Sequence, residues 1–186
     1  VPLMATVSFM LAGSKNEEST AKKDAYIAPP TLDDTYDATN SARVSVSGSS
    51  LNTTNIELFV NNEKIDSTAV GSDNTFSFDS VPLDSGENSI KVRAVVEGNQ
   101  KSSFSNTVTI SYLNKAPDLS IDNPSDGASF HKDEKTVEVK GKTDPGTRVT
   151  VNDFWAIVDT DGNYSYTVTL KDGDTDIKVQ ATDEAG

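Results

Sequence analysis

Of the residue types that most often perform chemistry in proteins, this chain is rich in carboxylates and poor in histidine and cysteine. The sequence has one histidine, His131, and no cysteine, so it offers neither a thiol nucleophile nor the ligands of a typical zinc site. Carboxylates are abundant, and several are adjacent, at Asp33-Asp34, Asp133-Glu134 and Asp183-Glu184. A general acid needs a carboxyl group in an apolar pocket that raises its pKa, whereas these pairs lie in polar, turn-forming stretches. The sequence therefore predicts no catalytic residues and no enzymatic activity.

Residues 159–163 (Asp-Thr-Asp-Gly-Asn) are similar to the start of a calcium-binding loop. An EF-hand loop also requires a glutamate at its twelfth position, and that position here is Leu170, inside an alternating stretch. We therefore interpret the segment as a hairpin turn built on Asp161, Gly162 and Asn163, and we expect no cofactor. A calcium site near the linker between two domains stays open as the alternative. Its candidate ligands are Asp118, Asp122, Asp183 and Glu184.

The aromatic pair Phe154-Trp155 begins the one stretch, 154–158, in which apolar residues occupy both alternating positions. A second copy of the surrounding pattern, described below, has Asn62 to Asp66 in this place, so the fold does not demand aromatic residues. Two interpretations follow. One ring of the pair caps the end of a sandwich or touches the other domain, or the pair forms an exposed patch that binds a sugar ring or a partner protein.

The elements that position these residues alternate apolar and polar side chains. Between Thr147 and Ala181, three alternating runs are separated by turns at 161–163 and 172–174, and each turn contains an Asp-Gly pair. Side chains of a strand point to opposite faces in turn, so a period of two predicts strands with one buried face. Asp-Gly pairs supply the positive φ that tight hairpins need. The pattern predicts an antiparallel sheet, and we expect no helix after residue 28.

The same pattern occurs twice. Arg43–Gly48 aligns with Thr136–Gly141, and Ile-Lys-Val at 90–92 aligns letter for letter with 177–179. Further matches pair Leu58, Val60, Asn61, Phe76 and Leu83 with Val149, Val151, Asn152, Tyr164 and Leu170. Self-similarity at this spacing predicts tandem domains, and short strands separated by turns are typical of antiparallel sandwiches. We therefore expect an all-β chain of two immunoglobulin-like sandwiches, at 29–114 and 115–186, with a short linker at 114–117.

The alignment also predicts the two cores and a missing strand. One core is expected to contain Val46, Val60, Phe78 and Val92, and the other Val139, Val151, Tyr166 and Val179. On the Ile-Lys-Val match Gly186 corresponds to Asn99, and the first copy then continues with an alternating strand over 104–113 that the second copy lacks. Two sources of that strand are open, namely a longer native protein and donation by another chain.

Four segments of the second copy carry a family resemblance. They are NPSDGASF (123–130), VEVKGKTDPGTRVTVN (137–152), VDTDGNYSYTVTL (158–170) and DIKVQATDEAG (176–186). Together they resemble bacterial immunoglobulin-like domains of the glucodextranase domain B kind. The resemblance extends over roughly 30–186, and the first copy fits more loosely because it lacks the Asn-Pro and Asp-Pro-Gly turns. It implies extracellular modules that occur on bacterial surface proteins and beside carbohydrate-active enzymes, with no catalytic residues to transfer.

Residues 1–13 form the only strongly apolar run without charge. Thirteen residues are too few to span a bilayer core, which needs roughly 20. We interpret the run as the end of a signal peptide or the outer part of a membrane anchor, with a buried strand or helix as the third option. Residues 14–28 are charged and lack glycine and proline, so they form either a short helix or a solvated tether, and we favour a tether that is helical over 16–24. Any contact with a membrane is expected through residues 1–28 alone.

The chain of 186 residues has a formal net charge of −13 and a pI near 4.3. This charge disfavours binding to nucleic acid and to anionic membrane surfaces. We therefore predict a non-catalytic bacterial module, extracellular or at the cell surface, that acts as a spacer or adhesive stalk and contacts a surface glycan or a protein. The alternatives are an accessory module of a larger carbohydrate-active enzyme and a pilin-like filament subunit that self-assembles.

Overall fold

The computed structural model of the protein describes residues 26–51 and 53–186. The predictions for the apolar segment 1–13 and for residues 14–25 of the tether lie outside the described residues. Within them, the regular structure consists of β-strands and one short 3₁₀ turn, η1 (Glu97–Asn99), so the all-β prediction is confirmed. No helix in these ranges is long and apolar enough to cross a membrane.

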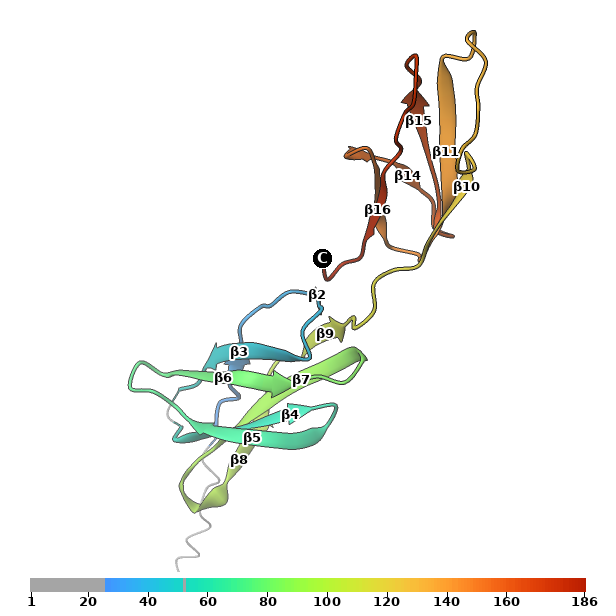
Figure 1. The fold of residues 1–186 in the computed structure, drawn as a ribbon. Coiled ribbons are helices and arrows are strands. Elements are labelled where there is room, and N and C mark those ends of the chain that lie inside the picture. The colour runs from blue at the N-terminus through green and yellow to red at the C-terminus, as the bar shows by residue number, and fades with distance from the viewer. Residues whose placement is uncertain (1–25, 52) are drawn as a thin grey trace, which may run out of the picture.

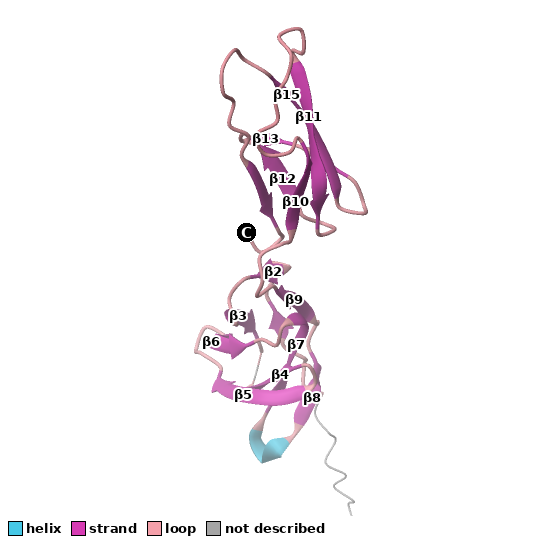
Figure 2. Cartoon of the chain, turned by 45° about the vertical axis from the view of Figure 1, so that its right-hand side comes forward, coloured by secondary structure: helices cyan, strands magenta, loops and turns pink. Residues whose placement is uncertain are grey.

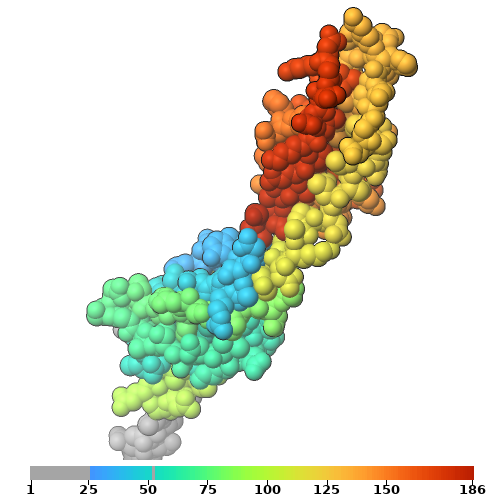
Figure 3. Space-filling model, viewed as in Figure 1, coloured from blue at the N-terminus to red at the C-terminus, as the bar shows by residue number. Residues whose placement is uncertain are grey.

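The strands fall into two groups along the chain (Figures 1 and 2). The first group comprises β1 (Thr31–Leu32), β2 (Ala38–Thr39), β3 (Arg43–Ser49), β4 (Asn55–Val60), β5 (Glu63–Ala69), β6 (Thr75–Pro82), β7 (Gly86–Val95), β8 (Lys101–Phe104) and β9 (Val108–Tyr112). The second comprises β10 (Leu119–Asn123), β11 (Thr136–Thr143), β12 (Arg148–Val151), β13 (Phe154–Trp155), β14 (Ile157–Val158), β15 (Asn163–Thr169) and β16 (Val179–Thr182). No sheet contains strands of both groups. We call the two groups domain 1 and domain 2, and in the space-filling view they lie one beyond the other (Figure 3).

Domain 1 packs a sheet of order β1-β3-β6 against a sheet of order β2-β9-β7-β4-β5, with β8 also paired to β7. Its pairings are antiparallel, except that β2 runs parallel to β9. The start of the domain therefore contributes β1 to one sheet and β2 to the other. Two antiparallel sheets packed face to face through their alternating apolar residues form an immunoglobulin-like sandwich.

Domain 2 repeats this plan with sheets of order β10-β11-β15-β14 and β13-β12-β16, all antiparallel. Its strand β16 pairs with β12 alone among the described strands. The equivalent strand of domain 1, β7, pairs with β4 on one side and with β9 and β8 on the other. Among the described strands, none takes the place beside β16 that β9 takes beside β7.

The two cores differ in size. Fourteen buried residues form the core of domain 1, including the predicted Val46, Val60, Phe78 and Val92. Six form the core of domain 2, among them Val139 and Val151, which are fully buried. Tyr166 and Val179, also predicted there, pack against this core but are only partly buried. The predicted inward faces are therefore confirmed, with the second core more open at its edges.

Most matches between the copies hold, but the Ile-Lys-Val match is wrong by two residues. The N–H of Asn61 donates to the carbonyl oxygen of Ser89 (2.9 Å), and its Oδ1 accepts from the N–H of Ser89 (2.9 Å). The matched Asn152 makes the same two contacts with Lys178, at 2.8 Å each. Ser89 is therefore equivalent to Lys178, and Ile90 lies opposite Val60 as Val179 lies opposite Val151.

The two-residue shift has a simple physical cause. Leu83 and the matched Leu170 both donate their N–H to the strand region before β3 or β11, at Ala42 and Lys135. The loop that follows is two residues longer in domain 2. Because strand side chains repeat every two residues, such a shift leaves the same face apolar, and the sequence pattern alone does not detect it. Gly186 thus corresponds to Glu97, two residues before the predicted Asn99.

A glycine and an aromatic ring pack identically in both copies. Gly48 lies opposite Phe76, and Gly141 lies opposite Tyr164. A Cβ atom on Gly48 would clash with the carbonyl oxygen of Thr31 and lie 2.6 Å from the ring of Phe76. One on Gly141 would clash with the carbonyl oxygen of Ser120 and lie 2.7 Å from the hydroxyl of Tyr164. Glycine therefore lets the first strand of each sandwich lie against an aromatic side chain.

Candidate binding surfaces

The segment 154–158 crosses from one sheet of domain 2 to the other. Its first part, β13, pairs with β12, whereas β14 pairs with β15 in the opposite sheet. Between them, the N–H of Ala156 donates to the carbonyl oxygen of Val149 (2.9 Å). The alternation restarts at this crossing, which explains the consecutive apolar residues. In domain 1 the corresponding chain continues as the seven-residue strand β5.

The two aromatic residues of β13 lie on opposite faces of their sheet. Phe154 is paired with Val151, which is fully buried, and Trp155 is paired with Thr150 on the other face. The ring of Phe154 stacks on that of Tyr166, with a centroid distance of 6.2 Å and an interplanar angle of 7°. Phe154 is 63% exposed and Trp155 67% exposed. Neither ring is buried as a cap of the sandwich, and the two do not form one flat platform.

Trp155 lies on the outer face of the β13-β12-β16 sheet. Thr150 is paired with Trp155 on one side and with Gln180 on the other, so the three side chains form a row. Two residues along β12, Arg148 occupies the same face, opposite Thr182. An exposed indole ring thus lies near hydroxyl, amide and guanidinium groups. Such groups donate to and accept from hydroxyl-rich ligands, while the ring offers an apolar surface.

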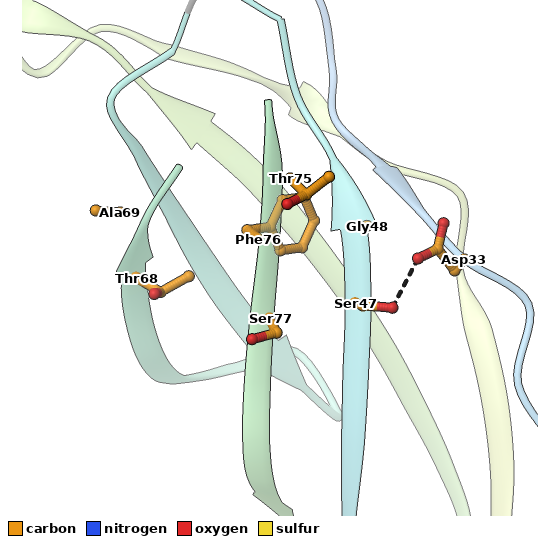
Figure 4. A pocket seen from close by; sticks show the side chains of 8 residues that line it. All are labelled: Asp33, Ser47, Gly48, Thr68, Ala69, Thr75, Phe76 and Ser77. Atoms are coloured by element: carbon orange, nitrogen blue, oxygen red, sulfur yellow. Dashed lines mark hydrogen bonds between the residues drawn. The ribbon is translucent and has the colours of Figure 1, made fainter. Parts of the chain in front are cut away.

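The single histidine and the carboxylate pairs are not assembled into a site. His131 is exposed in the loop between β10 and β11, and its backbone N–H donates to the carboxylate of Glu134 (2.6 Å). Asp33 accepts from the hydroxyl of Ser47 (2.6 Å) at the edge of a shallow hollow of about 430 Å³ beside the ring of Phe76 (Figure 4). In the described ranges no three Asp, Glu or His side chains are placed to hold a metal ion.

The calcium-like segment is a turn held by its own first aspartate. Asp159 accepts backbone N–H bonds from Asp161 (2.9 Å) and Asn163 (2.8 Å), and it also accepts from the side-chain amide of Asn163 (2.9 Å). These bonds, led by the side-chain amide, lower the pKa of Asp159. Gly162 has a φ of 82°, as the turn requires. The hairpin interpretation is confirmed, with Asp159 as the residue that organises the turn.

Three of the four linker carboxylates predicted as alternative calcium ligands, namely Asp118, Asp122 and Asp183, have local partners. The ammonium group of Lys115 donates a hydrogen bond to the carboxylate of Asp118 (2.8 Å), and this contact raises the pKa of Lys115. Asp183 accepts the backbone N–H groups of Ala185 (2.9 Å) and Gly186 (3.1 Å). Asp122 accepts a weak hydrogen bond from Ser120 (3.4 Å). A calcium site at the linker stays a prediction.

A cavity of about 1050 Å³ lies between two loops of domain 2. One loop follows β10 (124–135) and the other precedes β16 (170–177). Apolar lining comes from Ile121, Phe130 and Ile177, and Asp172, Asp174 and Asp176 line the same space. In domain 1 the equivalent of the loop before β16 is the loop before β7, and Asn88 closes it. Asn88 is fully buried; its Oδ1 accepts from the N–H of Asp84 (2.8 Å), and its Nδ2 donates to the carbonyl oxygen of Asp84 (2.7 Å). The residue equivalent to Asn88 is Ile177, so no such closure forms.

The sequence-based interpretation missed a charged cluster on domain 1. Glu57 is only 7% exposed, although it lies on the outer face of β4. Its carboxylate forms ion pairs with Lys64 Nζ (2.8 Å), Arg93 Nε (2.8 Å) and Lys101 Nζ (3.3 Å). The hydrogen bond from Lys64 and the further cations lower the pKa of Glu57 to about 2. The available signal was a glutamate inside the otherwise apolar run Ile56–Val60.

Two aromatic rings complete this cluster. Phe59 and Phe104 meet edge to face, with a centroid distance of 5.1 Å. The guanidinium group of Arg93 lies 4.8 Å from the ring centroid of Phe59 and 5.5 Å from that of Phe104. Lys91 Nζ lies 4.4 Å from the ring centroid of Phe104. We call Glu57, Phe59, Lys64, Lys91, Arg93, Lys101 and Phe104 the Glu57 cluster.

Comparison with known proteins relates the chain to parts of larger proteins. The chain is 33% identical over 148 residues to Bacillopeptidase F of Bacillus subtilis, an alignment that covers 80% of this chain and 10% of that protein. The chain thus spans about a tenth of the length of this relative.

Solved structures with a similar arrangement include the fibronectin(III)-like modules of Clostridium thermocellum CbhA, at 16% identity with a TM-score of 0.33. That alignment covers 46% of this chain and 90% of the other. The human OSCAR ligand-binding domain is 13% identical with a TM-score of 0.41, covering 78% and 84% of the two chains. The family model of glucodextranase, domain B, matches residues 117–186. Residues 117–186 are thus similar to glucodextranase domain B, and their two packed sheets form an immunoglobulin-like domain.

Proposed function

We propose that the chain is a non-catalytic, extracellular module of a larger bacterial protein, and that the outer face around Trp155 binds a neutral glycan. The observation that carries this proposal is the 67% exposed indole in a row with Thr150 and Gln180. A large exposed aromatic ring is costly in water, and an adjoining row of hydrogen-bonding side chains suits a sugar, which has both apolar ring faces and hydroxyl groups.

The accessory role is favoured over the free-standing stalk. The family model describes one domain of a glucodextranase, and the related peptidase is a much longer protein in which this chain matches a small part. Within the described residues, the histidine and the adjacent carboxylates are dispersed over exposed turns. Export is supported by the apolar run 1–13.

A spacer or adhesive stalk is the second candidate. Its support is the pair of sandwiches joined through the short segment between β9 and β10 (Figure 1). A short connection limits relative bending and keeps two modules apart. In this role Trp155 contacts a partner protein, and glycans do not retard the chain.

The test is affinity electrophoresis of the full chain through gels that contain neutral soluble glycans. We expect retardation by at least one glycan, and loss of that retardation in Trp155→Ala. The matched control is Phe130→Ala, which removes another exposed aromatic ring of domain 2 and should leave retardation unchanged. The melting temperature of Trp155→Ala should stay within about 2 °C of the wild type, since surface substitutions cost little. Equal retardation of wild type and Trp155→Ala would reject the Trp155 face.

The non-catalytic part of the proposal has its own test. Screens for glycosidase, esterase and peptidase turnover with the full chain should show no activity above a buffer blank. Turnover that disappears on changing a single carboxylate, for example Asp133→Asn or Glu184→Gln, would overturn it.

A further inference from the structure

Positive charge in domain 1 is concentrated on one face. Residues 26–114 contain five Lys or Arg and eleven Asp or Glu, a formal charge of −6. Arg43 is the only one of the five cations outside the Glu57 cluster. A domain that is acidic overall thus gathers four of its five cations in one place.

Strand register defines this face. Lys64 is paired with Phe59, which is paired in turn with Lys91. Glu57 is paired with Arg93, and Arg93 with Phe104. Directly paired residues share a face, so these side chains lie together on the outer surface of β5, β4, β7 and β8. Lys101, paired with Val95, belongs to the same surface.

The acidic residues of these strands mostly lie elsewhere. Glu63 and Asp66 of β5 are paired with Val60 and Leu58, which point into the core, so they belong to the opposite face. Glu87 is on the outer face of β7, but four residues from Lys91 and thus about 13 Å along the strand. The Glu57 cluster therefore contains four cations and one carboxylate, and three of the cations contact that carboxylate.

Glu57 holds the cations in place without cancelling them. Its two oxygens form ion pairs with Lys64, Arg93 and Lys101. Because all three share this carboxylate, the ion pairs fix the directions of three flexible side chains. Lys91 is held separately by the side-chain oxygen of Asn62 (2.6 Å). The side chains of Lys64 and Lys101 remain 48% and 34% exposed. Ordering of this kind reduces the entropy that a ligand must remove from the side chains when it binds.

From this arrangement we infer that the Glu57 cluster is a binding site for an acidic polysaccharide, a linear chain of sugars that carry carboxylates. The formal charge of the cluster is complementary to a polyanion. The cations are distributed over β5, β7 and β8, which suits an extended ligand better than a small anion. Phe104 is 39% exposed among them and offers apolar contact to a sugar ring. The surface is separate from the Trp155 face of domain 2 and does not depend on it.

The test measures binding of the full chain to polygalacturonate at about 20 mM and 300 mM NaCl. We expect binding at low salt and marked weakening at high salt, because exposed charges are screened over about 8–10 Å near physiological ionic strength. The double variant Lys91→Gln/Lys101→Gln, which keeps Glu57 with Lys64 and Arg93, should lose affinity about fivefold, the scale of two exposed ion pairs.

The matched control is Lys140→Gln/Lys142→Gln, which removes the same charge from exposed positions of β11 in domain 2 and should bind like the wild type. Equal losses in the two double variants would reduce the effect to net charge and overturn the site. Absence of binding to polygalacturonate, or tighter binding to single-stranded DNA or polyphosphate, would overturn the assigned ligand. Circular dichroism and melting curves show that each variant is folded. Retained binding in Trp155→Ala separates this result from the proposed function of domain 2.

Discussion

Domain 1 and domain 2 share a strand plan but hold their central strand differently. In domain 1, β7 has ten residues and partners on both sides, and it buries Ile90, Val92 and Ala94 completely. In domain 2, β16 has four residues and one described partner, and Val179 and Ala181 are only partly buried. In this pair of domains, the strand with partners on both sides is the one that buries its inward-facing residues completely.

The loop before this strand follows the same contrast. Asn88 closes the loop of domain 1 with bonds to the backbone of Asp84 and Gly86, and every polar atom of its amide is used. Domain 2 has a loop two residues longer with Ile177 in the equivalent place, and a cavity lies beside it. The buried amide of Asn88 thus makes several hydrogen bonds in domain 1 that have no equivalent in the longer, acidic loop of domain 2.

The largest effect is expected from Ile110→Ala, which removes a fully buried side chain of β9. Domain 2 has no described counterpart of β9, so this substitution tests directly what the last strand contributes. We predict a loss of about 2–5 kcal/mol in the free energy of unfolding of domain 1, from lost burial and the cavity that remains. Denaturant titration with hydrogen exchange reports each domain separately.

Ile157→Ala is the control for this prediction, because Ile157 is 77% exposed in domain 2. It should change the free energy of unfolding by less than about 0.5 kcal/mol. A loss below about 1 kcal/mol for Ile110→Ala would contradict the contribution of the last strand to the core.

Gly48 and Gly141 occupy equivalent places in the two domains. Gly48→Ala and Gly141→Ala each place a methyl group against a backbone carbonyl oxygen and an aromatic side chain. We expect each to destabilise its own domain by about 1–3 kcal/mol through overpacking. Hydrogen exchange should show the loss in β1 and β3 for the first variant and in β10 and β11 for the second. Destabilisation in one domain alone would mean that the two glycines are not equivalent.

Shortening an inward-facing valine of the central strand to alanine should destabilise domain 1 more than domain 2. Val92→Ala is expected to cost about 2 kcal/mol, since Val92 is fully buried between two paired strands. Val179→Ala should cost about 1 kcal/mol, because Val179 packs only at the edge of its core. Chemical denaturation of the two variants gives both values. Equal costs would show that the open edge of β16 is covered in solution.

The smallest effect is a difference in acid sensitivity. The pKa of Glu57 is lowered from 4.5 to about 2. A lowered pKa in the folded state stabilises the fold fully above pH 4.5, and this contribution is lost as the pH falls from 4.5 towards 2. We predict that Glu57→Gln flattens the pH dependence of domain 1 stability in this window and leaves that of domain 2 unchanged. An unaltered acid profile would show that the cations do not stabilise the ionised carboxylate.

The sequence was sufficient for the architecture because its period of two and its Asp-Gly turns report local backbone preferences directly. It was insufficient where a tertiary choice decides the outcome. The shift between Ile90 and Val179 preserves the apolar face, so periodicity could not reveal it. The crossing at Ala156 depends on which sheet each half of 154–158 joins. The Glu57 cluster unites β4, β5, β7 and β8, and its members are scattered over 57–104 in the chain.

The parallel pairing of β2 with β9 has a consequence under tension. The N–H of Ser111 donates to Asp37 and that of Leu113 to Thr39, at 2.8 and 2.9 Å. Because β2 lies near the start of domain 1 and β9 at its end, a pull on the two flanking chain segments slides these strands lengthwise past each other. Their bonds are then loaded together, whereas strands pulled apart from one end lose their bonds one at a time. The β2–β9 pair of domain 1 is therefore loaded in shear, and the described strands of domain 2 include no such parallel pair.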